Sequence, residues 1–97
     1  MTTIRNIRTV TAESLFGILK TEFATFVNQK LDSEVNVEFA HVDDIINVSF
    51  PEIIPGIAFY MTVSREDIHL ASNGDNHLEN SIVLEKQLVD FLELNVN

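Results

Sequence analysis

Apolar and polar side chains alternate along four short stretches between residues 34 and 71, and this pattern constrains the fold more than any other feature of the chain. A period of two places successive side chains on opposite faces of a β-strand. Turn-forming residues separate the stretches, so the pattern is typical of an antiparallel sheet with one apolar and one polar face. The predicted apolar positions are Val35, Val37, Phe39, Ile46, Val48, Phe50, Ile57, Phe59, Met61, Val63, Ile68 and Leu70.

The segment before this predicted sheet has the periodicity of an amphipathic helix. Thr11 is suited to the N-cap and Glu13 to the first turn, where the helix dipole favours a negative charge. We expect the helix to end near Lys30. Its apolar stripe recurs at steps of three and four residues and contains Ala12, Leu15, Phe16, Leu19, Phe23, Phe26 and Val27.

The segment after the predicted sheet also has helical periodicity. Asn76 and Glu79 resemble a capping box that opens a helix. Glu85 intrudes into the apolar arc, and we expect its carboxylate to lie at the helix edge. Val83 and Leu94 fall outside the arc. The arc itself contains Leu78, Ile82, Leu84, Leu88, Val89, Phe91 and Leu92.

The chain has 97 residues, which suits a single domain, and its 45% of hydrophobic residues supply one core. The apolar face of the sheet must be covered, and the flanking helices are the candidates. We therefore predict an α+β fold. It is a two-layer sandwich in the order helix, four-stranded antiparallel meander, helix, with both helices on one sheet face. Residues 1–10 form either a flexible arm or an edge strand that contributes Ile4, Ile7 and Val10.

The connection at residues 51–56 contains two prolines and one glycine, and Pro55-Gly56 suits the centre of a type II turn. Ile53 and Ile54 are unusual residues for such a loop. They either fold back to close one end of the core or form a knob that binds a partner. The sequence leaves both alternatives open.

Motifs of catalysis are absent from the sequence. It has no cysteine, and its three histidines are predicted in turns or on the polar sheet face, without the nucleophile and base that a hydrolase needs. Its three glycines form no phosphate-binding loop. Pairs of possible metal ligands are His41 with Asp43 and Asp44, Asp67 with His69, and Asp75 with His77. Because an acid-rich chain produces such pairs by chance, we expect a non-enzymatic protein with no cofactor and no metal.

The charge is unevenly distributed along the chain. Residues 1–30 hold two acidic and four basic residues, giving +2, and residues 31–97 hold thirteen acidic and two basic residues, giving −11. This balance disfavours direct binding to nucleic acid or to an anionic membrane, because phosphates are neutralised by clustered Lys and Arg. It favours a basic partner protein. The predicted partner-binding residues are Glu34, Glu38, Asp43, Asp44, Glu66, Asp67, Asp75 and Glu79.

The leading hypothesis is an acidic inhibitor that occupies a basic, nucleic-acid-binding site on a partner protein. Carboxylates at alternate strand positions are about 6.6 Å apart, so a sheet could carry a row of charges that mimics nucleic acid phosphates. In size and charge alone, the chain is similar to phage-encoded inhibitors of host defence, toxin immunity proteins and secretion chaperones.

The alternative is a structural or chaperone-like interaction module of a virion, secretion or immunity system. It would form a homodimer or hold a partner through a sheet edge or apolar surface. Because residues 1–10 lack the apolar run of a signal peptide, we expect a cytoplasmic location, in the host cytoplasm if the chain is phage-encoded. The apolar contacts would be made by Ile45, Ile53, Ile54, Ala58, Tyr60, Val83 and Leu94.

Overall fold

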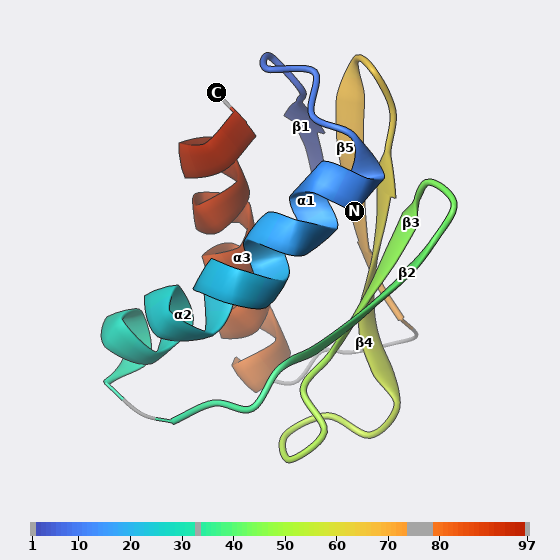
Figure 1. Cartoon of the computed structure of the whole chain (residues 1–97). Coiled ribbons are helices and arrows are strands. Elements are labelled where there is room, and N and C mark those ends of the chain that lie inside the picture. Colours follow the sequence, from blue (N-terminus) through green and yellow to red (C-terminus); the bar gives the residue numbers. More distant parts are fainter. Residues whose placement is uncertain (1, 33, 74–78, 97) are drawn as a thin grey trace.

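The computed structural model describes residues 2–32, 34–73 and 79–96 of the chain. The predicted α+β class and antiparallel strand pairing are confirmed (Figure 1). In chain order, the elements are β1 (Thr2–Arg5), α1 (Ala12–Ile18), the π-helical turn η1 (Leu19–Phe23), α2 (Ala24–Leu31), β2 (Glu38–Val42), β3 (Ile45–Ser49), β4 (Ile57–Val63), β5 (Asp67–Ser72) and α3 (Glu79–Val96).

The sheet has five strands in the order β1-β5-β4-β3-β2, and each neighbouring pair is antiparallel. The prediction of four strands was wrong, because β1 joins the meander beside β5 with Ile4 opposite Ile68. Ile4 is buried and Val10 packs against the core, whereas Ile7 is exposed. One buried position is too few to show a period of two, which is why the sequence left this strand as one of two alternatives.

The first helical segment begins and ends close to the predicted positions. The Oγ1 atom of Thr11 accepts the N–H of Ser14 at 3.1 Å, as expected of an N-cap. The segment ends at Leu31, and Asp32 then takes a left-handed φ of 50°. Within it, η1 is π-helical, and the Thr21 hydroxyl donates to the carbonyl of Gly17 at 2.9 Å. Every residue of the predicted stripe is buried or half-buried.

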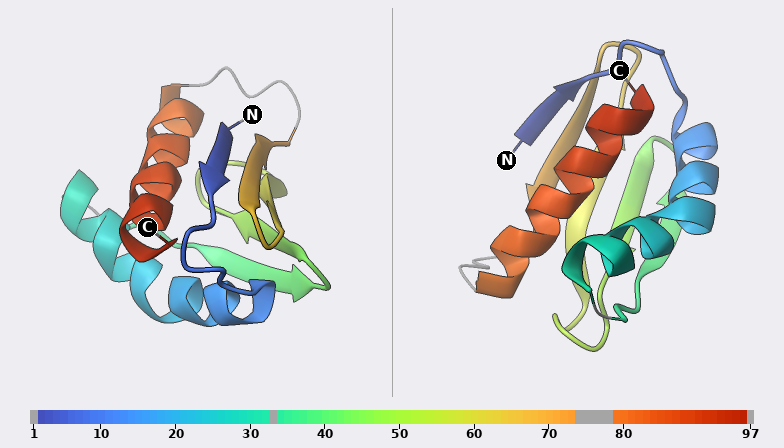
Figure 2. Two further views of the ribbon diagram at one scale, coloured as in Figure 1. Left: turned by 90° about the horizontal axis from the view of Figure 1, so that it is seen from above. Right: turned by 90° about the vertical axis from the view of Figure 1, so that its left-hand side faces the viewer.

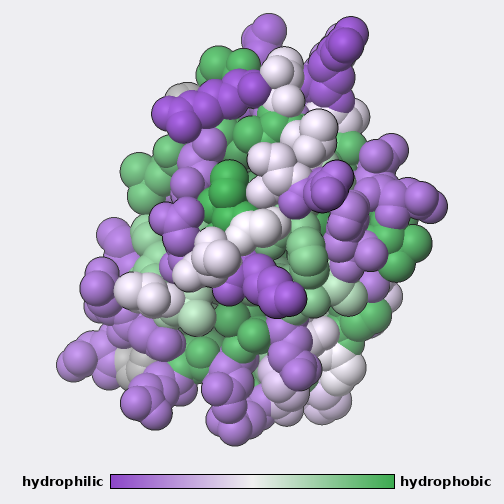
Figure 3. Space-filling view, viewed as in Figure 1, coloured by the Kyte–Doolittle hydropathy of each residue, from purple (hydrophilic) through white to green (hydrophobic). Residues whose placement is uncertain are grey.

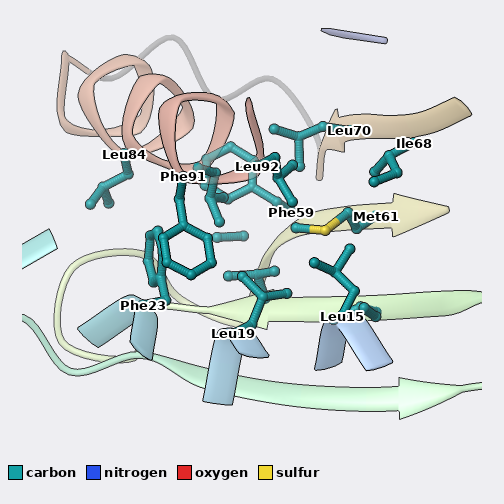
Figure 4. Packing of buried hydrophobic residues seen from close by; sticks show 14 of the residues in the cluster. Leu15, Leu19, Phe23, Phe59, Met61, Ile68, Leu70, Leu84, Phe91 and Leu92 are labelled. Atoms are coloured by element: carbon teal, nitrogen blue, oxygen red, sulfur yellow. The ribbon is translucent and has the colours of Figure 1, made fainter. Parts of the chain in front are cut away.

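Both helical segments lie on the same side of the sheet (Figure 2). α1 contacts β2 and β3, whereas α3 contacts β1 and α2. Phe23 of η1 joins these parts, because its ring lies 5.9 Å from the ring of Phe39 in β2 and 5.3 Å from that of Phe91 in α3. Figure 4 shows side chains from the helices and the strands meeting in one apolar cluster.

The buried side of α3 is narrower than predicted. Ile82 was assigned to the apolar arc but is 62% exposed, because Leu84, Leu88, Phe91 and Leu92 cover the core without it. Val83 and Leu94 are exposed and Glu85 is half-buried, as expected for positions outside the arc and at its edge. The predicted capping box at Asn76 and the inward position of Leu78 lie outside the described residues.

The connection between β3 and β4 closes one end of the core. Ile54 is buried and Ile53 packs against the core, which confirms the first of the two alternatives. Gly56 has a φ of 72°, the sign that the second central residue of a type II turn requires. β2 begins at Glu38 rather than at residue 34, yet Val35 is buried and its N–H donates to Asn28 Oδ1 at 2.7 Å.

Candidate protein-binding surface

The meander gives the sheet two ends that differ in charge. The turn end comprises the turns at residues 43–44 and 64–66 and the segment 6–10 that follows β1. The loop end comprises residues 32–38 and the connection at residues 50–56. Backbone hydrogen bonds hold the turn end together: Val63 N–H donates to the Asp44 carbonyl at 2.8 Å, and Asn6 N–H donates to the Glu66 carbonyl at 2.8 Å.

The acidic residues singled out from the sequence divide between these two ends. Asp75 lies outside the described residues, and only the backbone of Glu79, which begins α3, is described. The alternate positions that follow Glu38 in β2 are Ala40 and Val42, so β2 carries no row of carboxylates. Glu34 and Glu38 lie at the loop end, and Asp43, Asp44, Glu66 and Asp67 lie at the turn end.

At the loop end, Glu34 and Glu38 are joined by an acid that the sequence reasoning missed. Asn36 Nδ2 donates to Glu52 Oε1 at 2.7 Å, which brings the loop 50–56 against the start of β2. All three carboxylate-bearing residues are exposed. The sequence could have placed Glu52 at this end. In a meander, the connection between β3 and β4 lies at the end of the sheet where β2 begins.

At the turn end, arginines lie among the acids. Arg5 lies opposite Asp67 in the register of β1 and β5. A hollow of about 720 Å³ opens there, lined by Arg5, Asn6, Ile7, Thr9, Arg65, Glu66 and Asp67. The charges at this end therefore partly balance one another, whereas those at the loop end do not.

The open face, which is the side of the sheet away from the helices, has an uncharged centre. Val42 is 62% exposed and Ile45 is 42% exposed. The strand registers align the outward side chains in two rows that contain no Asp, Glu, Lys or Arg. The rows are Thr3, His69, Thr62, Ile45, Val42 and, next to it, Ala71, Tyr60, Asn47, Ala40.

Two details of this open face differ from the sequence-based expectation. Ala58 was expected to contribute to an apolar contact, but it is fully buried beside the register shift between Val48 and Ser49. Val42 was not singled out, although its alternation with Phe39 and His41 places it outward. Tyr60 and Ile45 lie on the open face as expected.

Charged residues border the uncharged centre and form its acidic rim. Glu38 marks the loop end of β2, Asp43 and Asp44 follow Val42, and Asp67 lies beside Arg5. Figure 3 shows hydrophobic surface next to hydrophilic side chains at the right-hand edge, where the β2–β3 hairpin lies in Figure 1. An apolar centre inside a charged rim is the usual anatomy of a protein–protein interface.

The described histidines make structural contacts. The His41 ring lies 5.5 Å from the ring of Phe16, and its Nε2 is 2.6 Å from the Asp43 carbonyl oxygen. His69 Nδ1 is 3.0 Å from the Thr3 hydroxyl. Within the described part of the chain, no three His, Asp or Glu side chains gather as a metal site.

A second apolar surface lies where α3 meets the first helical segment. Leu94 is 65% exposed, and Val83 lies exposed on the same helix. A hollow of about 480 Å³ beside Leu94 is lined by Thr21, Glu22, Thr25, Phe26, Gln29, Phe91, Leu94 and Asn95. This groove is rimmed by polar side chains and lies on the opposite side of the molecule from the open face.

Comparisons with family models, with curated proteins and with solved structures found no match to this chain. In the described residues, no helix combines the length and the hydropathy needed to cross a membrane.

Proposed function

We propose that this chain is a non-enzymatic binding protein that docks a basic partner protein on its open face. The observation that carries the proposal is the uncharged centre around Ile45 and Tyr60 in a chain of net charge −9. A sheet face that met only water would be expected to carry the polar and charged alternation of a solvated surface. Uncharged, partly apolar surface inside a charged rim favours contact with another protein.

The acidic rim indicates the chemistry of the partner. Glu38 begins β2, and Asp43 is the turn residue that directly follows the strand, which separates the two by roughly 17 Å at about 3.3 Å per residue. That spacing is too wide for a ladder of phosphate mimics, but it suits Lys and Arg side chains placed around an apolar centre. Carboxylates in the rim would steer such a partner and fix its orientation.

Single-strand nucleic-acid-binding sites have this complementary chemistry. They combine exposed aromatic side chains, on which bases stack, with surrounding Lys and Arg. We therefore identify the partner site as a basic nucleic-acid-binding surface, which the chain occupies as an inhibitor. The uncharged rows of the open face would cover the aromatic platform, and the rim acids would contact the Lys and Arg side chains around it.

The proposal is tested with charge reversals in the rim and a matched control. Proteins captured by the tagged chain from the lysate of its native host are identified, and their retention is measured against salt and against a single-stranded oligonucleotide. We expect E38K/D43K to weaken retention by at least about tenfold. The control E13K/E22K makes the same charge change on exposed positions of the first helical segment and should retain the partner.

A third variant tests whether partner binding depends on the open face itself or only on the net charge of the chain. Ala71→Arg places a bulky cation in the centre of the open face, so it should abolish retention while the fold persists. Equal losses for E38K/D43K and E13K/E22K, together with full retention by Ala71→Arg, would show that only net charge matters. A captured partner that resists the oligonucleotide would contradict the inhibitor assignment.

A second candidate function, self-association through the helical side, is supported by the exposure of Leu94 beside an apolar groove. Leu94 of one copy would pack against the groove of another copy, beside the half-buried ring of Phe26. Sedimentation at increasing protein concentration would detect a dimer, and Leu94→Glu should shift it to monomer. A wild-type chain that stays monomeric at millimolar concentration would contradict this second candidate.

A further inference from the structure

The β2 strand has backbone hydrogen-bonding groups that face away from the sheet. β2 is the last strand of the sheet, and Val42 pairs with Ile45 across a two-residue turn. The pair that closes such a turn is hydrogen-bonded, and hydrogen-bonded pairs then alternate along the hairpin. Val42, Ala40 and Glu38 therefore direct their N–H and C=O groups toward β3. Those of Phe39 and His41 point to the free edge.

Several of the usual protections of an edge strand are missing from β2. Natural edge strands are commonly blunted by lysine, proline, a bulge or a covering segment. β2 contains no lysine or proline, and its pairing with β3 runs without a register shift. Outside the ladders, no hydrogen bond between backbone groups of the described residues reaches residues 36–42, and the N–H of Val35, before the strand, is held by Asn28 Oδ1. The opposite edge, β1, is shorter, with four residues against five.

The charges on β2 and on the residues that flank it in the sequence are of one sign. Glu34 and Glu38 lie at one end of β2, and Asp43 and Asp44 lie at the other. The sequence contains no Lys or Arg between residues 31 and 64, so β2, β3 and β4 carry none. Lys20 approaches from the helical side, where its Nζ lies 5.6 Å from the Phe16 ring. The edge is therefore complementary to a basic segment, whereas a second copy would bring acids against acids.

We propose that β2 binds an extended basic segment of the partner as a sixth strand of the sheet. This inference rests on the proposed function and adds the mode of binding and the chemistry of the bound segment. Main-chain hydrogen bonds would run to Phe39 and His41, which supply affinity without regard to sequence. One set of alternate side chains would extend the open face beside Ala40 and Val42. Lys or Arg near the two ends of the segment would meet the four acids.

The experiment uses the full chain and a defined probe. The probe is an eight-residue peptide of alternating lysine and valine with blocked ends, added to the ¹⁵N-labelled chain at low salt. We expect the amide signals of Phe39 and His41 to shift and their hydrogen exchange to slow. A peptide of alternating glutamate and valine should leave these signals unchanged. A lysine–valine peptide that is N-methylated on one edge should bind at least about tenfold more weakly.

A pair of variants tests the same edge from the protein side. His41→Pro removes the outward N–H, and an edge position whose N–H faces solvent tolerates proline. His41→Ala removes the same side-chain contacts but keeps the N–H, so it is the matched control. We expect the lysine–valine peptide to bind His41→Ala and not His41→Pro. Equal binding to both variants, or unchanged affinity after N-methylation of the peptide, would overturn the sixth-strand proposal.

These outcomes are distinguishable from failure of the proposed function. If the captured partner is lost from Ala71→Arg but held equally by His41→Pro and His41→Ala, the open face binds the partner and strand addition is wrong. If the partner is held by Ala71→Arg but lost from His41→Pro, the edge binds it without the open face. Peptide-induced shifts at Tyr60 and Ala71 without exchange protection at Phe39 and His41 would also overturn strand addition.

Discussion

The side chain of Asn6 holds together the backbone of the turn end. It is only 3% exposed, and its Nδ2 atom donates to the carbonyls of Val10 at 2.9 Å and Ser64 at 2.8 Å. Its Oδ1 atom accepts the N–H of Val10 at 2.9 Å. The amide therefore ties the segment after β1 to the β4–β5 turn. Both segments border the acids of the turn end.

We predict that Asn6→Ala lowers the free energy of unfolding by about 2 to 4 kcal/mol, because it removes all the hydrogen bonds of a buried amide and leaves part-buried backbone groups of Val10 and Ser64 unpaired. Urea denaturation measures the loss. Asn95→Ala is the control, since the half-buried Asn95 makes one such bond, from Nδ2 to the Phe91 carbonyl at 2.8 Å. The assignment fails if Asn6→Ala costs no more than Asn95→Ala.

For the helices and strands, the length of the periodic pattern decided which elements could be predicted from the sequence. The stripe of the first helical segment repeats over four turns, so its buried side was predicted correctly. The strands β3, β4 and β5 alternate long enough to be recognised in the same way. β1 has one buried residue, Ile4, and its place beside β5 depends on a partner distant in sequence. Local pattern carries no information on such pairing.

The candidate surface was harder to predict than the fold, for a related reason. Counting acids along the chain suggested one acidic face, but the meander sends Glu38 to one end of the sheet and Asp43 to the other. Glu52 joins the acids of the loop end only through its contact with Asn36. The uncharged rows of the open face become visible only once the register aligns Val42 with Ile45 and Thr62.

The molecule as a whole is electrostatically asymmetric. The chain has fifteen acidic and six basic residues. The salt bridge found among the described residues, from Lys86 Nζ to Asp90 Oδ2 at 3.2 Å, is solvent-exposed and lies on α3. At the loop end, Glu34, Glu38 and Glu52 are exposed together. Self-repulsion of these charges opposes the compact state, so the acids at the loop end are retained at a cost in stability.

Salt should therefore stabilise this protein. Raising NaCl from 0.01 M to 1 M shortens the screening length from about 30 Å to about 3 Å, and we expect the free energy of unfolding to rise by about 1 kcal/mol.

Glu52→Gln removes one charge and keeps an oxygen for Asn36 Nδ2. It should be a few tenths of a kcal/mol more stable than wild type at low salt, with the difference vanishing at 1 M. Glu22→Gln, on the exposed side of η1, is the control and should show a smaller difference. Thermal unfolding followed by circular dichroism would measure both effects. If stability instead falls as salt rises, attractive charge pairs outweigh the repulsion. The acids at the loop end would then not lower the stability of the fold.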